Sequence, residues 1–400
     1  MEIVIQKFGG TSVADLSKIR NVANIIKTET ETGKQIVAIV SAMAGATNAL
    51  ITKCSEISKL DRQSHLREYD AALASGEIIT SSLLALQLQS MGLQAKSLQG
   101  WQIPLKTDDT HGNSQIIDID PKILKKMLKS GIIPVITGFQ GITPSGDVST
   151  LGKGGSDTSA ALIAASLNAI RCDIYTDVDG VYSADPRIVH TAKKIDVINI
   201  DELYALCIAG AKVLHPRAAL AAKRYSFPMR ILSSFTDVAG TIVEIKETNM
   251  ESKLITAITS NKNLLKIDIE YNTGDFAKII GNFVDDSISI EQTYNLGNGT
   301  ATIIANLTDK NKCQKLLEHL KNDSLLIKKY ELSANISTVT IVGYGIKNDK
   351  RLSWKLVEIL TDNSIEIFAS HLSDIKMSIL IDEQNNEKVI KLLHDYCFGK

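Results

Sequence analysis

The fold is decided by a pattern that begins at residues 3–12, which read Ile3-Val4-Ile5-Gln6-Lys7-Phe8-Gly9-Gly10-Thr11-Ser12. The segment Ile3–Gln6 has the apolar character and length of a buried strand, and the two glycines after it are typical of a turn. Apolar residues then follow the i, i+3, i+4, i+7 spacing of a helix with one buried face, at Ile19, Val22, Ala23 and Ile26. The start of the chain therefore predicts a strand, a glycine turn and an amphipathic helix.

The same order of strand, loop and helix recurs up to about residue 245. Further strands are predicted at Ile36–Val40, Ile132–Thr137, Cys172–Thr176 and Met229–Leu232, and further helices at Arg67–Gln89 and Ser156–Ala169. Strands that alternate with helices predict an α/β fold, here an αβα sandwich in which helices cover both faces of a mainly parallel sheet. Ligands of such sheets bind at the carboxyl ends of the strands, which is where the glycine loops fall.

From about residue 252 the glycine loops become rare and the order of elements changes. Residues 264–332 predict one α+β unit of the form βαββαβ, with strands at Leu264–Tyr271, Ser287–Tyr294, Ala301–Leu307 and Leu326–Leu332 and helices at Gly274–Asp285 and Asn311–Lys321. A second such unit begins with strand Thr338–Gly343 and ends one strand short, and we expect the strand Leu254–Thr259 to complete it. The predicted domains are therefore residues 1–245, 262–333 and 334–400, the last completed by a strand within residues 252–261.

Composition narrows the classes of function. Lysine plus arginine (44) nearly balances aspartate plus glutamate (45), and no basic block interrupts this balance, so a nucleic-acid partner is not expected. The chain starts MEIVIQ, without a basic segment before an apolar one, and neither a signal peptide nor an 18-residue membrane span is predicted. Five cysteines are scattered without CxxC spacing, which favours a cytoplasmic protein without structural zinc or a disulfide framework.

Two glycine-rich turns contain the residue types that bind phosphate. In KFGGTS (residues 7–12), backbone N–H groups and a lysine suit a polyanion, although a plain strand–helix turn looks the same. In TLGKGGSDT (residues 150–158), glycines, a lysine and a serine precede an apolar helix, which predicts a second anion site. Asp157 either caps that helix or orients a lysine. A P-loop is excluded, because Gly146 is one residue too far from Gly152-Lys153 and no hydroxyl residue follows the lysine.

Polar residues also follow other predicted elements. The segment TDVDGVYSADPR (residues 176–187) contains a turn-forming Asp-Gly pair, and its polar side chains either cap that turn or hold the base and sugar of a nucleotide. Lys212 lies in a loop between helices, either exposed or directed at phosphate, whereas His215 is interpreted as a helix-start hydrogen bond. Ser41 and Glu77 suit an amino acid, because a carboxylate pairs with an ammonium group.

Taken together, these segments resemble one family. Eight motifs occur in the order seen in aspartate kinases, namely KFGGTS, VSAMAGATN, ASGE, GWQIPLKTDDTH, GFQG, TLGKGGSDT, TDVDGVYSADPR and GAKVLHP. The resemblance covers residues 1 to about 245 and implies the amino-acid-kinase fold. It also implies a monofunctional phosphotransferase with a carboxyl group as acceptor. Such an enzyme uses ATP and Mg²⁺ to convert L-aspartate into 4-phospho-L-aspartate, the first step toward lysine (through diaminopimelate), threonine and methionine.

The motifs of this family imply roles for individual residues. Lys7 and Lys212 would stabilise charge on the transferring phosphoryl group, and Asp157 would hold these lysines in place. The other residues of the ATP site would be Gly9, Gly10, Ser12, Thr176, Asp177, Tyr182, Arg187 and Val213. The residues that bind aspartate would be Ser41, Thr47, Glu77, Lys153 and Ser156, with Lys153 standing where the family usually has arginine. No side chain is assigned to the metal, and no general base is needed because a carboxylate is already a nucleophile.

The C-terminal part resembles the paired ACT domains of the same family more loosely. IVGYG (residues 341–345) is similar to the first strand and turn of the second domain, whereas residues 272–275 and 370–374 depart from the family pattern. The resemblance implies a homodimer or higher homo-oligomer formed through these domains. It also implies feedback by an amino-acid effector, lysine in the first place or threonine, with weak or absent feedback as the alternative.

Two other functions are weighed against this one. A kinase of another carboxylate, such as an acetylated amino acid, is disfavoured by the motif around GWQIPLKTDDTH and by the ACT-like tail. A catalytically idle amino-acid sensor is disfavoured because Lys7, Asp157 and Lys212 are all present. A fused homoserine dehydrogenase is not expected at this length.

Overall fold

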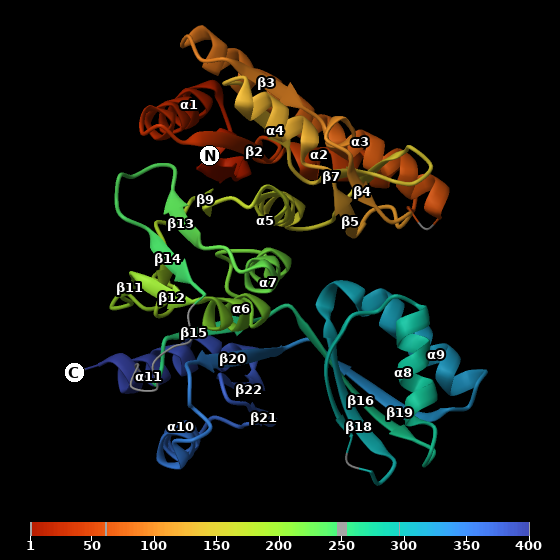
Figure 1. Cartoon of the computed structure of the whole chain (residues 1–400). Coiled ribbons are helices and arrows are strands. Elements are labelled where there is room, and N and C mark those ends of the chain that lie inside the picture. Colours follow the sequence, from red (N-terminus) through yellow and green to blue (C-terminus); the bar gives the residue numbers. More distant parts are fainter. Residues whose placement is uncertain (1, 61, 246–253, 296, 400) are drawn as a thin grey trace. The chain divides into compact units, whose positions relative to one another are not determined.

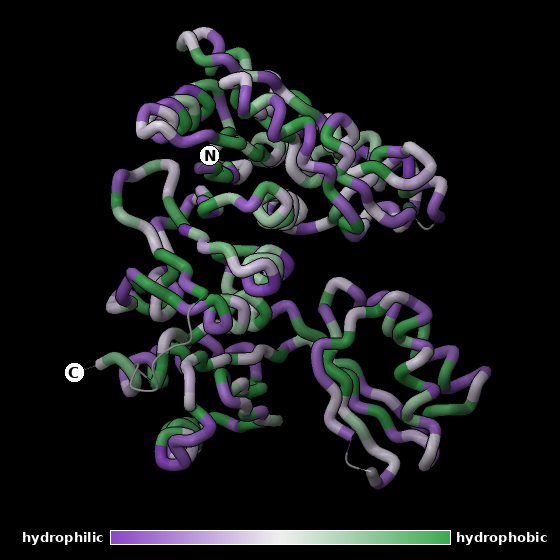
Figure 2. The backbone as a smooth tube through the Cα atoms, viewed as in Figure 1, coloured by the Kyte–Doolittle hydropathy of each residue, from purple (hydrophilic) through white to green (hydrophobic). Residues whose placement is uncertain are grey.

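The structure is a computed structural model that describes residues 2–60, 62–245, 254–295 and 297–399. Contacts divide the chain into two compact units. The first contains the described residues of Met1–Ser183, Lys193–Ile208 and Lys212–Ser252, and the second those of Ala184–Ala192, Ala209–Ala211 and Lys253–Lys400. Figure 2 shows hydrophobic residues recurring at short intervals along the helices, the pattern of elements with one buried face.

An eight-stranded sheet forms the centre of the first unit, in the order β12-β14-β13-β9-β1-β2-β6-β3. Its strands are β1 (Ile3–Phe8), β2 (Gln35–Val40), β3 (Ala95–Leu98), β6 (Ile133–Thr137), β9 (Arg171–Thr176), β12 (Val197–Asn199), β13 (Met229–Ser233) and β14 (Thr241–Glu244). Neighbouring strands are parallel except for β13 with β14. The mainly parallel sheet predicted from the sequence is therefore confirmed, and β1 at its centre is buried along its whole length.

Helices cover both faces of this sheet (Figure 1). On one face, α1 (Leu16–Glu31) and α3 (Gln63–Ser90) share an apolar core with Val4 and Phe8 of β1. Successive side chains of a strand alternate between faces, so Lys7 points to the other face, against which α5 (Gly155–Leu167) packs. The remaining helices of this unit are α2 (Ala46–Ile57), α4 (Lys122–Lys129), α6 (Ile200–Ile208) and α7 (Pro216–Tyr225).

A small four-stranded sheet, which the sequence did not predict, leads into the glycine-rich segment of residues 150–158. Its order is β5-β4-β7-β8, with β4 at Leu105–Thr107, β5 at Ile116–Ile119, β7 at Gln140–Ile142 and β8 at Val148–Thr150. Three- and four-residue strands carry too few side chains to show an alternating pattern. The sheet matters for function because β8 ends at Thr150, where the glycine-rich segment TLGKGGSDT begins.

The longest helix, α3, has the length and hydropathy of a helix that could cross a membrane, contrary to the expectation that no such span exists. Half of its most apolar window is buried inside the unit. The buried residues include two carboxylates, Asp70 and Glu77. Partial burial in the unit and buried carboxylates are features of a core helix in a globular unit. The apolar composition of α3 follows from the side chains that it packs into that core.

The second unit contains two four-stranded sheets. The first has the order β17-β18-β16-β19, from β16 (Leu264–Tyr271), β17 (Ile290–Asn295), β18 (Thr300–Asn306) and β19 (Ile327–Ser333), with helices α8 (Phe276–Asp285) and α9 (Lys310–Asn322). The second has the order β15-β20-β22-β21, from β15 (Ala257–Asn261), β20 (Ile336–Val342), β21 (Ala369–Leu372) and β22 (Lys376–Asp382), with helices α10 (Lys350–Asp362) and α11 (Asn386–Phe398). Each sheet and its two helices enclose an apolar core.

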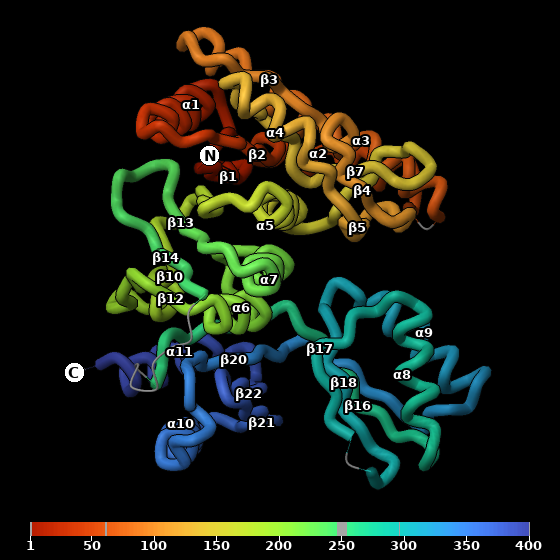
Figure 3. Tube along the Cα trace, in the orientation of Figure 1, coloured from red at the N-terminus to blue at the C-terminus, as the bar shows by residue number. Residues whose placement is uncertain are grey.

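The strand order shows how the chain passes between the two sheets. β15 is antiparallel to β20, with Ala257 opposite Val342, while β16 to β19 form a sheet of their own. The chain therefore visits the second sheet at β15, forms the first sheet, and returns at β20 (Figure 3). β15 begins three residues later than the strand expected at Leu254–Thr259, and residues 252 and 253 lie outside the described residues.

Candidate active site

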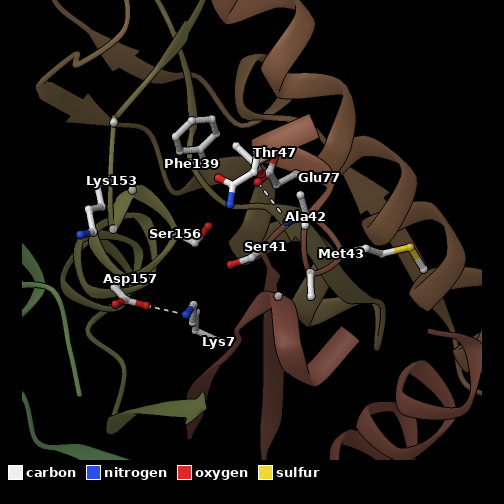
Figure 4. A pocket seen from close by; sticks show the side chains of 17 residues that line it. Lys7, Ser41, Ala42, Met43, Thr47, Glu77, Phe139, Lys153, Ser156 and Asp157 are labelled. Carbon is white, nitrogen blue, oxygen red and sulfur yellow. Dashed lines mark hydrogen bonds and ion pairs between the residues drawn. The ribbon is translucent and has the colours of Figure 1, made fainter. Parts of the chain in front are cut away.

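A cavity of about 310 Å³ lies where β1, β2 and the start of α5 meet in the first unit. Eight residues predicted for the site line it: Lys7, Gly10, Ser41, Thr47, Glu77, Lys153, Ser156 and Asp157. Figure 4 shows Lys7 and Asp157 joined on one side and Glu77 across the cavity from Lys153. The two glycine-rich segments, more than a hundred residues apart in the sequence, thus face the same space.

Lys7 and Asp157 form an ion pair with 2.6 Å between Nζ and Oδ1, and their side chains are only 10% and 14% exposed. The other oxygen of Asp157 accepts a hydrogen bond from the backbone N–H of His215, at 3.2 Å. Charges so poorly solvated interact more strongly than surface ions do. Asp157 therefore fixes the position of the Lys7 ammonium group at the end of β1.

Two glycines allow the glycine-rich segments to approach their neighbours. A Cβ atom on Gly10 would lie 2.8 Å from the carbonyl oxygen of Ala42. Gly154 has a φ of +71°, and a Cβ atom there would lie 2.1 Å from the ring of His215. Helix α5 starts directly after Gly154, without a side-chain N-cap hydrogen bond. The N–H of Gly155 donates to the carbonyl of Gly152 at 3.0 Å, so the N–H groups that this end of the helix offers to an anion are those of Ser156 and Asp157.

Glu77 is the buried carboxylate of the cavity, with 3% of the residue exposed. Its Oε1 accepts a hydrogen bond from the N–H of Ala42 at 3.0 Å, while its Oε2 has no hydrogen-bond partner among the described residues. Burial raises the pKa of Glu77 to about 7, against a smaller lowering by the Ala42 N–H. A buried carboxylate with one unpartnered oxygen can form an ion pair with a cationic group that enters the cavity, and that group would favour its charged form.

The remaining predicted residues are not among the described residues that line the cavity. Gly9 donates its N–H to the carbonyl of Tyr175, and the Ser12 hydroxyl accepts from that of Ser234 at 2.7 Å. Three more lie in or near β9 and the short strand β10 (Val181–Tyr182). Thr176 ends β9 and shares a hydrogen bond of 3.1 Å with Asp177, and the hydroxyl of Tyr182 in β10 donates to Asp179. Lys212, which is exposed, and Val213 follow α6. Arg187 belongs to the second unit and pairs with Asp185.

Sequence reasoning missed several residues of the cavity wall. Met43, Ala44, Asn48 and Phe139 line it, and none was chosen as a site residue. Phe139 follows β6 with a φ of +71°, which is uncommon for a residue other than glycine. Its position in the motif GFQG was the available signal in the sequence. An apolar side chain that lines a cavity has no charged or hydrogen-bonding group that would distinguish it from a core residue.

Comparison with known proteins agrees with this geometry. The profile of the amino acid kinase family matches residues 2–233, and an ACT domain profile matches residues 331–395. An aspartokinase of Rickettsia felis is 45% identical over 397 residues, covering 99% of both chains, and aspartokinase 2 of Bacillus subtilis is 37% identical, covering 99% of this chain and 97% of its own. The chain belongs to the aspartokinase family.

The solved structures of aspartokinases have the same fold. Aspartokinase III of E. coli in complex with aspartate and ADP superimposes with a TM-score of 0.86 at 26% identity, over 99% of this chain and 100% of that one. The same E. coli enzyme in complex with lysine and aspartate superimposes with a TM-score of 0.76 at 26% identity, over the whole of both chains. The predicted family, α/β fold and enzyme class are thereby confirmed. As an aspartokinase, the protein transfers a phosphoryl group to a carboxyl group of aspartate.

Proposed function

We propose that this aspartokinase phosphorylates the β-carboxylate of L-aspartate with ATP in the cavity between β1, β2 and α5. The observation that carries the proposal is the convergence of the Lys7–Asp157 ion pair, the N-terminus of α5 and the buried Glu77 around one cavity. It combines a cation and backbone N–H groups for phosphate with a carboxylate for an ammonium group.

Aspartate is held, in this proposal, by charges on opposite sides of the cavity. Glu77 has an oxygen without a hydrogen-bond partner among the described residues, and the substrate ammonium group supplies one. Lys153 pairs with the α-carboxylate, while the hydroxyls of Ser41, Thr47 and Ser156 bind the remaining oxygens. A substrate with both an ammonium and a carboxylate group satisfies this arrangement, whereas an acetylated amino acid would leave Glu77 without its cation.

The chemical step needs positioning and charge neutralisation. The β-carboxylate oxygen attacks the γ-phosphorus, the bond to the β,γ-bridging oxygen breaks, and ADP leaves with that electron pair. Lys7 stabilises the negative charge of the transferring phosphoryl oxygens, and Asp157 keeps its ammonium group in place. We assign Lys212 to the same charge, on the basis of its motif. No proton is removed from the nucleophile, so no side chain serves as a base.

We propose that the nucleotide lies along Gly9, Gly10 and Ser12 and over the turns that follow β9 and α6. The residues of the first unit proposed to hold its base, ribose and phosphates are Thr176, Asp177, Tyr182 and Val213. When bound with the nucleotide, Mg²⁺ would supply positive charge that neutralises the phosphates. The Lys7 ammonium group at the first glycine turn suits a magnesium–nucleotide complex, because it would add a cation and hydrogen-bond donors beside the phosphates.

We propose further that residues 262–333 and 334–400, the latter completed by residues 252–261, are ACT domains that bind an amino-acid effector, lysine or threonine, and join subunits into a homodimer or larger homo-oligomer. The family of the chain and the ACT match over residues 331–395 support this proposal. The product then enters cytoplasmic synthesis of lysine, threonine and methionine.

One experiment tests the catalytic and regulatory parts together. Aspartate-dependent ATP turnover is measured on the full chain, with N-acetyl-aspartate and glutamate as alternative substrates, and is then titrated with lysine, threonine and methionine. Turnover that requires aspartate supports the proposed reaction. ATP hydrolysis independent of aspartate, together with tight lysine binding, would instead favour an amino-acid sensor.

A further inference from the structure

A second buried carboxylate of α3, Asp70, lies outside the lining of the cavity and is fully buried. Its Oδ2 accepts hydrogen bonds from His111 Nδ1 at 2.8 Å and from the Gly112 N–H at 3.0 Å. Its Oδ1 accepts from the same N–H at 3.1 Å and from the hydroxyl of Thr150 at 2.5 Å. Asp70 thus joins three segments: helix α3, the loop of residues 108–114 and the end of β8.

Arg217 of α7 ties two of the same segments together. Its guanidinium group donates to the carbonyl oxygen of Leu151 at 2.7 Å and to that of Ser114 at 3.1 Å. The N–H of Ser114 donates to the carbonyl of Thr150 at 2.8 Å. The start of the glycine-rich segment is therefore fixed by side chains from two helices, and both contact residues that are distant in the sequence.

The positions of these contacts relate them to the substrate site. Asp70 lies seven residues, which is two helical turns, before Glu77, so both point to the same side of α3. Thr150 lies three residues before Lys153. The far end of the segment is held separately, because Asp157 in α5 contacts Lys7 and the N–H of His215. Asp70 is thus a direct link between the helix of Glu77 and the loop of Lys153, in addition to the ion pair of Arg67 in α3 with Asp147, the residue before β8.

We propose that Asp70 is a positioning residue that sets the separation between Glu77 and Lys153, and that it thereby selects aspartate over its longer homologue glutamate. The inference rests on the proposed function, in which these two residues hold the ammonium and α-carboxylate groups. A fixed pair of charges fixes the α-carbon, and only a side chain of one length then places its carboxylate at the γ-phosphorus. If the separation between Glu77 and Lys153 is no longer fixed, the α-carbon of glutamate can bind further from the γ-phosphorus. Its longer side chain then still places a carboxylate at that phosphorus.

The test is Asp70→Asn, which keeps the volume of the side chain. The N–H of Gly112 can only donate and contacts both oxygens of Asp70, so either orientation of the amide places its NH₂ group against that donor. The Thr150 hydroxyl and the His111 ring can accept as well as donate, so they do not remove this conflict. We expect the KM for aspartate to rise about tenfold. We also expect kcat and the KM for ATP to stay within about threefold, because Lys7 and Asp157 keep their contacts, and the preference in kcat/KM for aspartate over glutamate to fall at least several-fold.

Asp173→Asn is the matched control. Asp173 is also fully buried and also accepts charged hydrogen bonds, from Arg171 and Arg230. It lies opposite Gln6 in the β1–β9 register, so it points to the face of the sheet away from Lys7. We expect it to lower the melting temperature and to leave the KM for aspartate and the glutamate preference unchanged. If Asp70→Asn fails to fold, Thr150→Val removes one donor from the same network and should change KM in the same direction.

The outcomes separate this inference from the proposed function. A wild-type chain without aspartate-dependent turnover would overturn the proposed function. An active wild type whose KM and substrate preference are unaffected by Asp70→Asn and by Thr150→Val overturns the positioning role alone. The same holds if Asp173→Asn changes KM and preference as much as Asp70→Asn does, since the effect would then be general loss of rigidity.

Discussion

The Nζ atom of Lys7 lies 2.6 Å from the Oδ1 atom of Asp157 and joins the first glycine turn to the second. Each partner belongs to a regular element, β1 and α5, and each is nearly buried. Removing either partner of such a pair leaves the other as an uncompensated charge. The pair therefore holds the Lys7 ammonium group in place, at the position that the proposed function assigns to phosphoryl charge.

Lys7→Ala is expected to lower kcat about 100- to 1000-fold, the range for losing one group that stabilises transition-state charge. The KM for aspartate should change by less than about threefold, because the residues proposed to bind aspartate are others. Steady-state kinetics with each substrate varied in turn checks this. Lys106→Ala serves as the control, since Lys106 is exposed and pairs only with Asp118 among the described residues. A raised KM with normal kcat would show that Lys7 is a simple binding group.

The KM for aspartate is expected to rise as the pH falls below 7. The pKa of Glu77 is about 7 in the unliganded protein, because burial disfavours its charged form. Below that pH Glu77 is neutral and cannot pair with an ammonium group, so KM should rise about tenfold per pH unit. Kinetics between pH 5.5 and 8.5 measure the profile. Glu77→Gln should have a high KM with little dependence on pH, and a flat wild-type profile would refute the role of Glu77.

The same pKa affects stability in the opposite sense. Because the pKa of Glu77 is raised from 4.5 to about 7 on folding, the folded protein holds this proton more tightly than the unfolded chain does. The contribution of protonated Glu77 to the free energy of unfolding is largest below pH 4.5 and is lost as the pH rises to about 7. Relative to Glu77→Gln, the free energy of unfolding of the wild type should fall by about 1–3 kcal/mol across that interval. Urea unfolding at several pH values tests this, and parallel curves for the two proteins would contradict it.

Lys153→Arg is expected to lower the KM for aspartate about three- to tenfold, because a guanidinium group binds a carboxylate through two parallel hydrogen bonds. The turnover number should stay unchanged, since the proposed binding mode pairs Lys153 with the α-carboxylate and not with the reacting carboxylate. Lys153→Met keeps most of the length but removes the charge, and it should raise KM. Kinetics of the two variants beside the wild type separate charge from geometry. An unchanged KM in the arginine variant would show that lysine serves this site equally well.

The sequence predicted those elements whose pattern is local in the chain, and it missed those that depend on pairing between distant segments. Strands such as β1 and β2 were found because buried parallel strands are continuous apolar runs. The short strands of the β5-β4-β7-β8 sheet were missed, because pairing between distant segments stabilises them more than local propensity does. The start of β15 was misplaced by three residues for the same reason.

The site follows the same rule. Lys7 and Glu77 were recognised because glycines and charges beside them form local motifs, and both line the cavity. Asp70 and Arg217 were not, because each acts on backbone or hydroxyl groups that lie more than forty residues away in the chain. Their own neighbours in the sequence are those of ordinary helices. Such residues become visible only when the partners are located in space.

The pairing of β15 with β20 imposes an order on folding during synthesis. Asn261 leaves the ribosome well before its partner Thr338, and the whole β16–β19 sheet lies between them. That sheet has its own core, so it can form first while β15 waits as an unpaired strand. When β15 then pairs with β20, the folded β16–β19 sheet already holds the segments on either side of it close together. The entropic cost of this pairing is therefore smaller than for a flexible loop of the same length. A fragment meant to contain the second sheet must therefore begin before β15 rather than at residue 334.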